Sequence, residues 1–254
     1  MKLFFWVLIS IFIANPTARF QKDLWVVWSV GQGQWTTLVQ TQRCLHFDMG
    51  GEFWPESHWL NHCSKVENSI FISHLDWDHI SFLKKWSWRA RKSCLMPVFN
   101  FDFTTQKKKA LIESFSKCPD ELRQKLNSNL AQEVVWSPQH LKIKNQNDLS
   151  RIWQIRKKIL VTGDSPRAAE KFWLQKMSLE MRKAVRILVV GHHGSRTSTS
   201  KELLESLTHL HAGLVSARAA KYGHPHNQVI SQFAQQKTPL LTTEKWGHLI
   251  FEMD

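Results

Sequence analysis

Acidic residues are scarce in this sequence. Its 254 residues include 21 aspartates and glutamates against 34 lysines and arginines, which gives a formal net charge of +13 at pH 7. Such an imbalance points toward a polyanionic partner, either nucleic acid or an anionic membrane surface. Plain solubility or a generally basic proteome explains the charge equally well, so any partner has to be argued from the motifs.

Cysteine is rarer still, with Cys44, Cys63, Cys94 and Cys118 as its only representatives. Their spacings do not resemble a zinc-finger pattern, which argues against a structural zinc site of that kind. In an exported protein the four would be candidates for disulfide bonds, with three possible pairings that the sequence leaves open.

The sequence begins with Met1-Lys2 and one apolar run, Leu3–Ala14, which is too short to span a bilayer comfortably. A polar stretch ending at Ala18 follows, so residues 1–18 are predicted to be a signal peptide cleaved near that residue. An uncleaved amino-terminal anchor is the alternative. Both predict an exported protein, periplasmic or extracellular, whose residues 19–254 form the folded domain.

The densest group of chemically active residues is the heptapeptide Ser73–His79, which follows an apolar, strand-like run. His74, Asp76 and Asp78 alternate, so an extended chain would direct all three to one side, with His79 added at the following turn. Two histidines and two carboxylates so close together are typical of a zinc or manganese site. A surface turn with incidental acidic residues is the alternative.

Two further groups lie at predicted strand ends. Asp164 follows Thr162-Gly163, where an aspartate can bind a metal or cap the next helix. His192 and His193 stand between two glycines, which would let backbone and ligand approach closely, although histidine pairs often serve packing alone. A last polar group contains Arg218 and the run Tyr222–His226.

Basic residues also gather in two clusters, Arg89–Lys92 and Lys107–Lys109, the first of them close to Trp86 and Trp88. Cations that hold phosphates and aromatic rings that stack on bases are the ingredients of a nucleic-acid groove. A solvated helix face is the alternative for each lysine.

Strand-like and helix-like stretches alternate in both halves of the chain, which predicts two sheets covered by helices. The expected strands are 24–30, 35–40, 43–48, 70–73, 151–155, 158–161, 185–190, 213–216, 240–243 and 247–252. The expected helices are 80–88, a polar stretch within 106–132, 166–181, 200–209 and 227–236.

Six short motifs together resemble the metallo-β-lactamase superfamily and, within it, the hydrolase domain at the carboxyl end of the ComEC/Rec2-type competence proteins. In chain order they are Val30–Gly33, Asp48–Gly50, Ser73–His79, Leu160–Asp164, Gly191–Ser195 and Tyr222–His226. They span the chain from about Leu24 to its end in the family's order. The resemblance implies an α/β fold, a four-layer αββα sandwich with two divalent ions, zinc or manganese, along one edge of the sheets.

The resemblance also implies a role for each motif residue. His74 and Asp76 would hold one ion, Asp78 and His79 the other, Asp164 would bridge them, and His192 or His193 would complete the second site. Asp48 would hold the metal loop from behind the ligands. Asp164, His224 and His226 would be catalytic, while Ser195, Arg218 and Tyr222 would contact the substrate.

The sequence departs from the family at three points. Ser29 and Gln34 replace aspartates that usually flank the Val-Gly-Gln-Gly turn. His140 is the only histidine between the first motif and Asp164, where the superfamily at large takes a further ligand, so the first metal site is expected to be ligand-poor. The multi-helix channel of full-length competence proteins is not in this sequence, so we do not expect the chain itself to be a DNA pore.

The implied reaction is phosphodiester hydrolysis of DNA in connection with DNA uptake. Two ions about 3.5–4 Å apart can share a hydroxide and orient it for in-line attack, while a protonated His224 or His226 assists the leaving group. A membrane DNA-uptake channel would be a partner. Two alternatives stay open: hydrolysis of another bond, in a β-lactam, thioester or lactone, and a non-catalytic DNA-binding protein.

Overall fold

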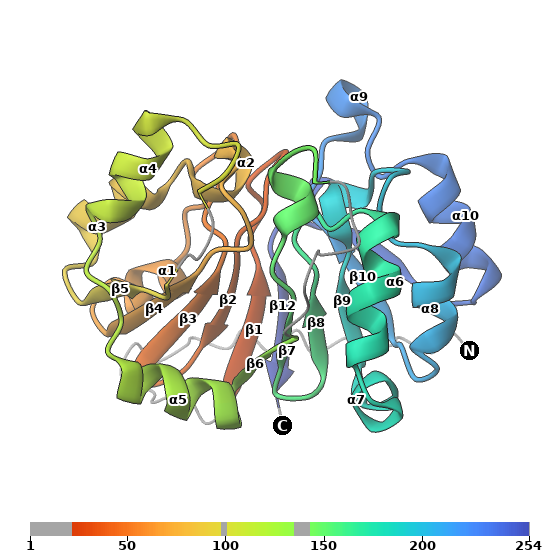
Figure 1. Ribbon diagram of the computed structural model, residues 1–254, viewed down its shortest axis with the longest axis horizontal. Helices are drawn as coiled ribbons and strands as arrows, with labels where there is room; N and C mark the ends of the chain where they lie inside the picture. The colour runs from red at the N-terminus through yellow and green to blue at the C-terminus, as the bar shows by residue number, and fades with distance from the viewer. Residues whose placement is uncertain (1–21, 98–100, 135–142, 254) are drawn as a thin grey trace, which may run out of the picture.

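The computed structural model describes residues 22–97, 101–134 and 143–253. The expected signal peptide or anchor, residues 1–18, and His140 lie outside these ranges. Two six-stranded sheets face each other, with α1, α3 and α4 beside the first sheet and α6, α8 and α10 beside the second (Figure 1). This is the expected αββα sandwich.

The first sheet has the strand order β12-β1-β2-β3-β4-β5. The pairs β3–β4 and β4–β5 are parallel, and the other pairs are antiparallel. The final strand of the chain therefore completes the sheet in which the chain starts. The strands are β1 (Asp23–Val27), β2 (Thr36–Val39), β3 (Arg43–Phe47), β4 (Glu67–Phe71), β5 (Ser93–Leu95) and β12 (Leu249–Met253).

The second sheet has the order β11-β10-β9-β8-β7-β6, parallel from β11 to β8 and antiparallel from β8 to β6. The strands are β6 (Ala131–Glu133), β7 (Trp153–Ile155), β8 (Ile159–Val161), β9 (Ile187–Val189), β10 (Ala212–Val215) and β11 (Leu240–Thr242).

Alternate residues of one strand enter different layers of the core, because successive side chains leave a strand on opposite faces. In β1, Trp25 and Val27 pack between the two sheets, whereas Leu24 and Val26 pack toward the helices of the first sheet. A third core layer lies between the second sheet and its helices. Both faces of each sheet are thus covered, which explains the nearly continuous apolar runs of these strands.

Several expected helices are divided in the structure. The stretch 80–88 becomes α2 (Trp77–Ile80) and α3 (Leu83–Arg89), and the polar stretch 106–132 becomes α4 (Gln106–Glu113), α5 (Asp120–Asn129) and β6. The stretch 166–181 becomes α6 (Arg167–Lys176) and α7 (Leu179–Ala184). The other helices are α1 (His58–Cys63), α8 (Lys201–Ser206), α9 (Ala219–Tyr222), α10 (Asn227–Gln235) and α11 (Thr243–Trp246), with short 3₁₀ turns η2 (Gln146–Leu149) and η3 (Gly191–Gly194).

The four cysteines form two disulfides, Cys44–Cys63 and Cys94–Cys118. This selects one of the three pairings that the sequence left open. Both bonds lie in the half of the molecule built on the first sheet, where they tie β3 to α1 and β5 to the segment before α5. None of the helices in the described ranges is long and apolar enough to cross a membrane.

Candidate metal centre

The expected metal ligands converge at one edge of the sandwich, where strands of both sheets end. β4 of the first sheet leads to His74 and the residues after it, β8 of the second sheet leads to Asp164, and β9 leads to His193. Because the carboxyl ends of parallel strands meet at one sheet edge, loops far apart in the sequence contribute to a single site.

The Ser73–His79 loop is not extended throughout, contrary to the expectation from its alternating pattern. The chain is extended at Asp76, with φ −80° and ψ 149°, and then enters α2 at Trp77. Asp78 and His79 therefore reach the site from the first turn of a short helix. Gly50 allows this turn to pack against the preceding loop, because a Cβ at Gly50 would lie only 2.4 Å from the carbonyl carbon of Asp78.

Four side chains bring one potential ligand atom each to within 4.8 Å of one another: Asp78, His79, Asp164 and His193. His193 Nε2 lies 3.2 Å from Asp78 Oδ2 and 3.9 Å from Asp164 Oδ2. His79 Nε2 lies 3.0 Å from Asp164 Oδ1. Of the two adjacent histidines that the sequence could not separate, His193 joins this group, whereas His192 Nε2 stands beside it, 3.7 Å from Asp164 Oδ2.

His74 and Asp76 form the second half of the cluster, which also meets Asp164. His74 Nε2 is 3.6 Å from Asp76 Oδ2 and 3.8 Å from Asp164 Oδ2, so Asp164 faces both halves of the cluster. The other oxygen of Asp76 accepts a 2.9 Å hydrogen bond from the ammonium of Lys108 in α4, a lysine that is only 8% exposed. This half of the cluster thus contains a cation supplied by the protein.

Asp48 holds the metal loop from behind. Its carboxylate accepts hydrogen bonds from the backbone N–H and the hydroxyl of Ser73, at 2.7 and 2.8 Å, and from the side-chain amide of Gln34, at 2.7 Å. Its Oδ2 is also 2.8 Å from His79 Nδ1, which leaves Nε2 of that ring facing Asp164. Gln34, found where the family usually has an aspartate, supplies a neutral donor to a carboxylate that another aspartate would repel.

Charges within the cluster move its pKa values in opposite directions. Burial alone would lower the pKa of His79, but Asp164 and Asp48 on either side raise it well above its ordinary value. Burial would likewise raise the pKa of Asp164, but His79 and His193 hold it well below its ordinary value. Burial and the nearby His79 lower the pKa of His74 to about 4, so this ring is neutral at pH 7 and can act as a ligand.

The backbone is strained where it presents these side chains. His192 and His193 have φ values of 50° and 53°, and Asp48 has 55°, in the left-handed region that costs a residue with a Cβ roughly 1–2 kcal/mol. Such conformations persist where the surrounding structure imposes them, and they concentrate at functional sites.

The donor set fits a divalent ion. His74 Nε2, His79 Nε2 and Asp164 Oδ1 are buried, and no aligned hydrogen bond reaches them from the described residues. Polar atoms left in this state destabilise a protein unless another partner satisfies them. Histidine nitrogens and carboxylate oxygens 3.0–3.9 Å apart suit one ion with bonds of about 2.0–2.2 Å, and the mixed set suits zinc or manganese.

Solved structures share this architecture across nearly the whole chain. The metallo-β-lactamase fold protein YhfI from Bacillus subtilis superimposes with a TM-score of 0.52 at 10% identity, covering 91% of this chain and all of that one. A diphosphatase from the PhnP family gives 0.50 at 11% identity, covering 92% and 98% of the two chains. The chain has the metallo-β-lactamase fold. A diiron β-hydroxylase with this fold architecture, CmlA from Streptomyces venezuelae, gives 0.51 at 11% identity, covering 94% and 55%.

Two curated proteins are similar in sequence. Recombination protein 2 of Haemophilus influenzae is 24% identical over 243 residues, which are 91% of this chain and 29% of that protein. ComE operon protein 3 of Bacillus subtilis is 28% identical over 88 residues, 35% of this chain and 11% of that protein. The chain thus spans less than a third of either relative. No family model matches the sequence. The similarity to these two proteins agrees with the expected resemblance to ComEC/Rec2-type proteins.

Two residues that were expected to contact the substrate, Arg218 and Tyr222, bind Glu52, a residue that the sequence did not single out. Glu52 accepts hydrogen bonds from Arg218 at 3.2 Å, Lys221 at 2.7 Å and Tyr222 at 3.1 Å. Its Oε2 also accepts from the backbone N–H of Gln32. Arg218 and Tyr222 therefore anchor the loop around α9 to Glu52 in the segment after β3, and Glu52 in turn holds Gln32 in the turn between β1 and β2.

The three remaining candidates differ in position. His224 lies at the rim, with its ring 6.2 Å from that of His192 and its Nδ1 3.1 Å from the side-chain amide of Gln32. His226 caps α10 by accepting from the backbone N–H of Gln228. Ser195 is buried, with its hydroxyl 3.0 Å from that of Thr197. Of the three, His224 is the one whose ring approaches His192, the histidine that stands beside the four candidate ligands.

Sequence reasoning missed the supporting residues of the centre. Ser73, Gln32, Glu52 and Lys108 all contact site residues, but their partners are mostly tens of residues away in the chain. The sequence indicated Ser73, Gln32 and Lys108 only as members of a motif or a basic cluster, without their role at the site, and Glu52 carried no signal.

Proposed function

We propose that the chain is an exported, metal-dependent phosphodiesterase that cleaves nucleic acid, with DNA as its substrate. The observation that carries the proposal is the convergence of Asp78, His79, Asp164 and His193 beside His74. Among the described residues, no aligned hydrogen bond reaches the buried atoms His74 Nε2, His79 Nε2 and Asp164 Oδ1. Two divalent ions, zinc or manganese, would be held, one by this group and one by His74, Asp76 and Asp164.

Bound ions would supply Lewis-acid activation of water and neutralise the charge that develops on phosphoryl oxygens. The protein's own residues prepare this site. Asp48 fixes the ring of His79 so that Nε2 faces Asp164, and Ser73 holds Asp48 in turn. Such support behind the ligands keeps donor atoms oriented before an ion binds.

His224 would act through a hydrogen bond. Its Nδ1 accepts from Gln32, whose own oxygen accepts from the backbone N–H of Arg218, so the proton of the neutral ring is on Nε2. Burial, and then the nearby His192, lower the pKa of His224 below its ordinary value. His224 would therefore act as a neutral imidazole whose Nε2–H donates a hydrogen bond to the leaving oxygen, and not as the protonated acid that the sequence suggested.

The choice of a polyanionic substrate has separate support. The net charge of +13 would concentrate nucleic acid at the site, and the name of one relative, Recombination protein 2, points to nucleic-acid metabolism. Export is supported by the two disulfides, which persist in oxidising compartments. A membrane DNA-uptake channel is the partner that the ComEC/Rec2 resemblance suggests.

The test is elemental analysis of the purified chain together with cleavage assays on single-stranded DNA, a β-lactam, a thioester and a lactone, each with and without chelator. We expect bound metal and chelator-sensitive cleavage of DNA alone. If the chain binds metal but cleaves one of the other substrates, the metal site serves the hydrolysis of that bond and not of a phosphodiester. A chain without metal that still binds DNA would be the non-catalytic binding protein.

A further inference from the structure

A groove with a volume of about 680 Å³ runs beside the metal loop, between α2 and α3 on one side and α4 on the other. These elements lie together on the outer side of the first sheet (Figure 1). Trp77, Lys84 and Trp88 line one wall, and Lys107 and Leu111 line the other. Trp77 stands between Asp76 and Asp78 in the chain, so one end of the groove lies next to the loop that carries these candidate ligands.

Two tryptophan rings are unusually accessible on this wall. Trp77 is 41% exposed and Trp88 is 73% exposed. Trp86, two positions earlier on α3, is fully buried against Trp35, because two residues on a helix point in nearly opposite directions. The position of Trp88 is therefore not needed for the core, and exposed large apolar groups of this kind mark binding surfaces.

A lysine accompanies each exposed ring. Lys107 Nζ lies 5.3 Å from the centre of the Trp77 ring, and Lys84 Nζ lies 5.4 Å from that of Trp88. Lys84 and Trp88 are four residues apart on α3 and so share one face. No acidic residue is among those found to line the groove in the described part of the chain. Its charge thus complements a polyanion.

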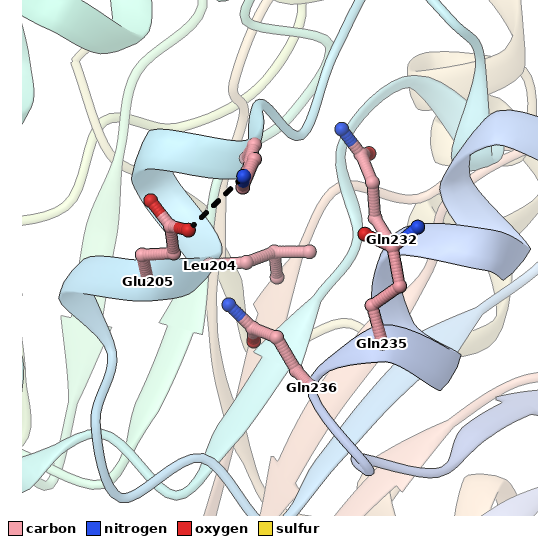
Figure 2. Close-up of a pocket in the computed structure, with 6 residues that line it drawn as sticks. Leu204, Glu205, Gln232, Gln235 and Gln236 are labelled. Carbon is pink, nitrogen blue, oxygen red and sulfur yellow. Dashed lines mark ion pairs between the residues drawn. The ribbon is translucent and has the colours of Figure 1, made fainter.

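A second hollow lies between α8 and α10, and its lining differs from that of the groove (Figure 2). Its volume is about 240 Å³, and its lining is dominated by glutamines such as Gln232 and Gln236. Its lysine, Lys201, is paired with Glu205 at 3.5 Å. This hollow lacks the exposed rings and the unopposed cations that distinguish the groove beside the metal loop.

We propose that the groove binds single-stranded DNA, with bases stacked on Trp77 and Trp88 and phosphates paired with Lys84 and Lys107, and that it leads the strand to the metal loop. A duplex hides its base faces, whereas a single strand can offer them to the rings. The lysines leave the ring faces to bind phosphates when bases arrive. This inference rests on the proposed nucleic-acid substrate and specifies its form and its path.

The experiment measures binding of a fluorescein-labelled single strand of about 15 nucleotides by anisotropy, in chelator, so that no cleavage occurs. Trp88→Ala should weaken binding about five- to hundredfold, and Trp88→Phe should restore most of it, because phenylalanine keeps a stacking face. Trp77→Ala should act similarly. Trp246→Ala is the matched control: Trp246 is 60% exposed and has Lys245 over its ring, but it does not line the groove, and we expect a change below about twofold.

Salt and strand form provide the second readout. Lys84→Ala and Lys107→Ala should each reduce the slope of log affinity against log salt by about 0.7, the value for one phosphate contact on a single strand. A duplex of the same sequence should bind more weakly than the single strand. Tighter binding of the duplex than of the single strand would contradict the proposal that the groove binds single-stranded DNA. Wild-type affinity in both tryptophan variants would contradict it too. Neither result would affect the phosphodiesterase proposal. No binding of any polynucleotide would overturn both.

Discussion

Two polar clusters each surround a fully buried histidine but have opposite properties. The edge cluster is the candidate metal centre, formed by His74, Asp76, Asp78, His79, Asp164 and His193. The inner cluster lies within the first sheet and consists of Trp35, Thr37, His46 and Asn68. Each contains a fully buried histidine held by several polar groups.

The inner cluster is neutral and its histidine is fully satisfied. His46 Nδ1 lies 3.1 Å from Trp35 Nε1 and 2.9 Å from Thr37 Oγ1, and its Nε2 lies 2.9 Å from Asn68 Oδ1. Burial lowers the pKa of His46 to about 4, because no carboxylate compensates for the loss of water. Every ring nitrogen has a partner from the protein, so this histidine serves packing.

The edge cluster is charged and incomplete. His79 lies between two carboxylates that raise its pKa, and its Nε2 has no aligned hydrogen bond from the described residues. His46 and His79 are both fully buried, so the burial of a histidine carries little information about its function. A concentration of charge together with unsatisfied ligand atoms separates a site from a structural network.

The largest effect is expected from neutralising Asp164, which faces both halves of the edge cluster. Asp164→Asn should lower DNA hydrolysis by about a thousandfold or more, because a shared carboxylate ligand is lost where several kcal/mol of charge stabilisation are needed. Binding of single-stranded DNA in chelator should change little. Glu205→Gln, in an exposed ion pair on α8, is the control. Undiminished hydrolysis would exclude Asp164 from the reaction.

The same substitution in the two clusters should have opposite consequences. His79→Gln should weaken metal binding at least about a hundredfold, since even groups behind a ligand contribute ten- to hundredfold. His46→Gln should leave metal affinity within about threefold but reduce the free energy of unfolding by about 1–3 kcal/mol, because buried donors lose their acceptor. Metal titration calorimetry and urea unfolding of both variants measure the pair. If His46→Gln loses metal, the two clusters are not independent.

Much of the fold was predictable from the sequence, because its signals are local. The expected strand 158–161 is apolar from Ile159 to Val161 and contains the observed β8, whereas the predictions failed at helix ends, as at α2 and α3. The alternating pattern of the metal loop indicated an extended chain, but close packing of Gly50 against Asp78 accommodates a helical turn there.

The site was predictable only in part, for the same reason. Its ligands stand in short motifs, whereas Lys108 meets Asp76 from 32 residues away and Glu52 gathers residues more than 160 positions later. Nothing local distinguishes Lys108 from Lys107 and Lys109 beside it. The placement of His46 in a neutral network, too, depends on β2 and β4 as neighbours of β3.

Acid should weaken the inner cluster in a defined pH window. The pKa of His46 is about 4 in the folded chain and about 6.5 when unfolded, so below pH 6.5 the unfolded chain binds a proton that the folded chain does not. Stability is therefore complete above that pH and falls as the pH decreases toward 4. Between pH 7 and pH 5 the wild type should lose about 2 kcal/mol more than His46→Gln in chemical unfolding. Equal losses would mean that His46 is not the neutral, buried group described here.

The two halves of the edge cluster differ in one cation, the ammonium of Lys108. Lys108 Nζ lies 2.9 Å from Asp76, so the half-site of His74 and Asp76 already contains a lysine ammonium. Lys108→Met keeps the length of the side chain and removes the charge. The affinity for the more weakly bound ion should therefore rise about tenfold, and the affinity for the other ion should stay unchanged. Calorimetric titration with zinc or manganese resolves the two steps, and Lys109→Met, an exposed neighbour paired with Glu113, is the control. Weaker binding in Lys108→Met would instead show that the ammonium orients Asp76 for the ion, and that the protein's cation assists the metal where we expect it to compete.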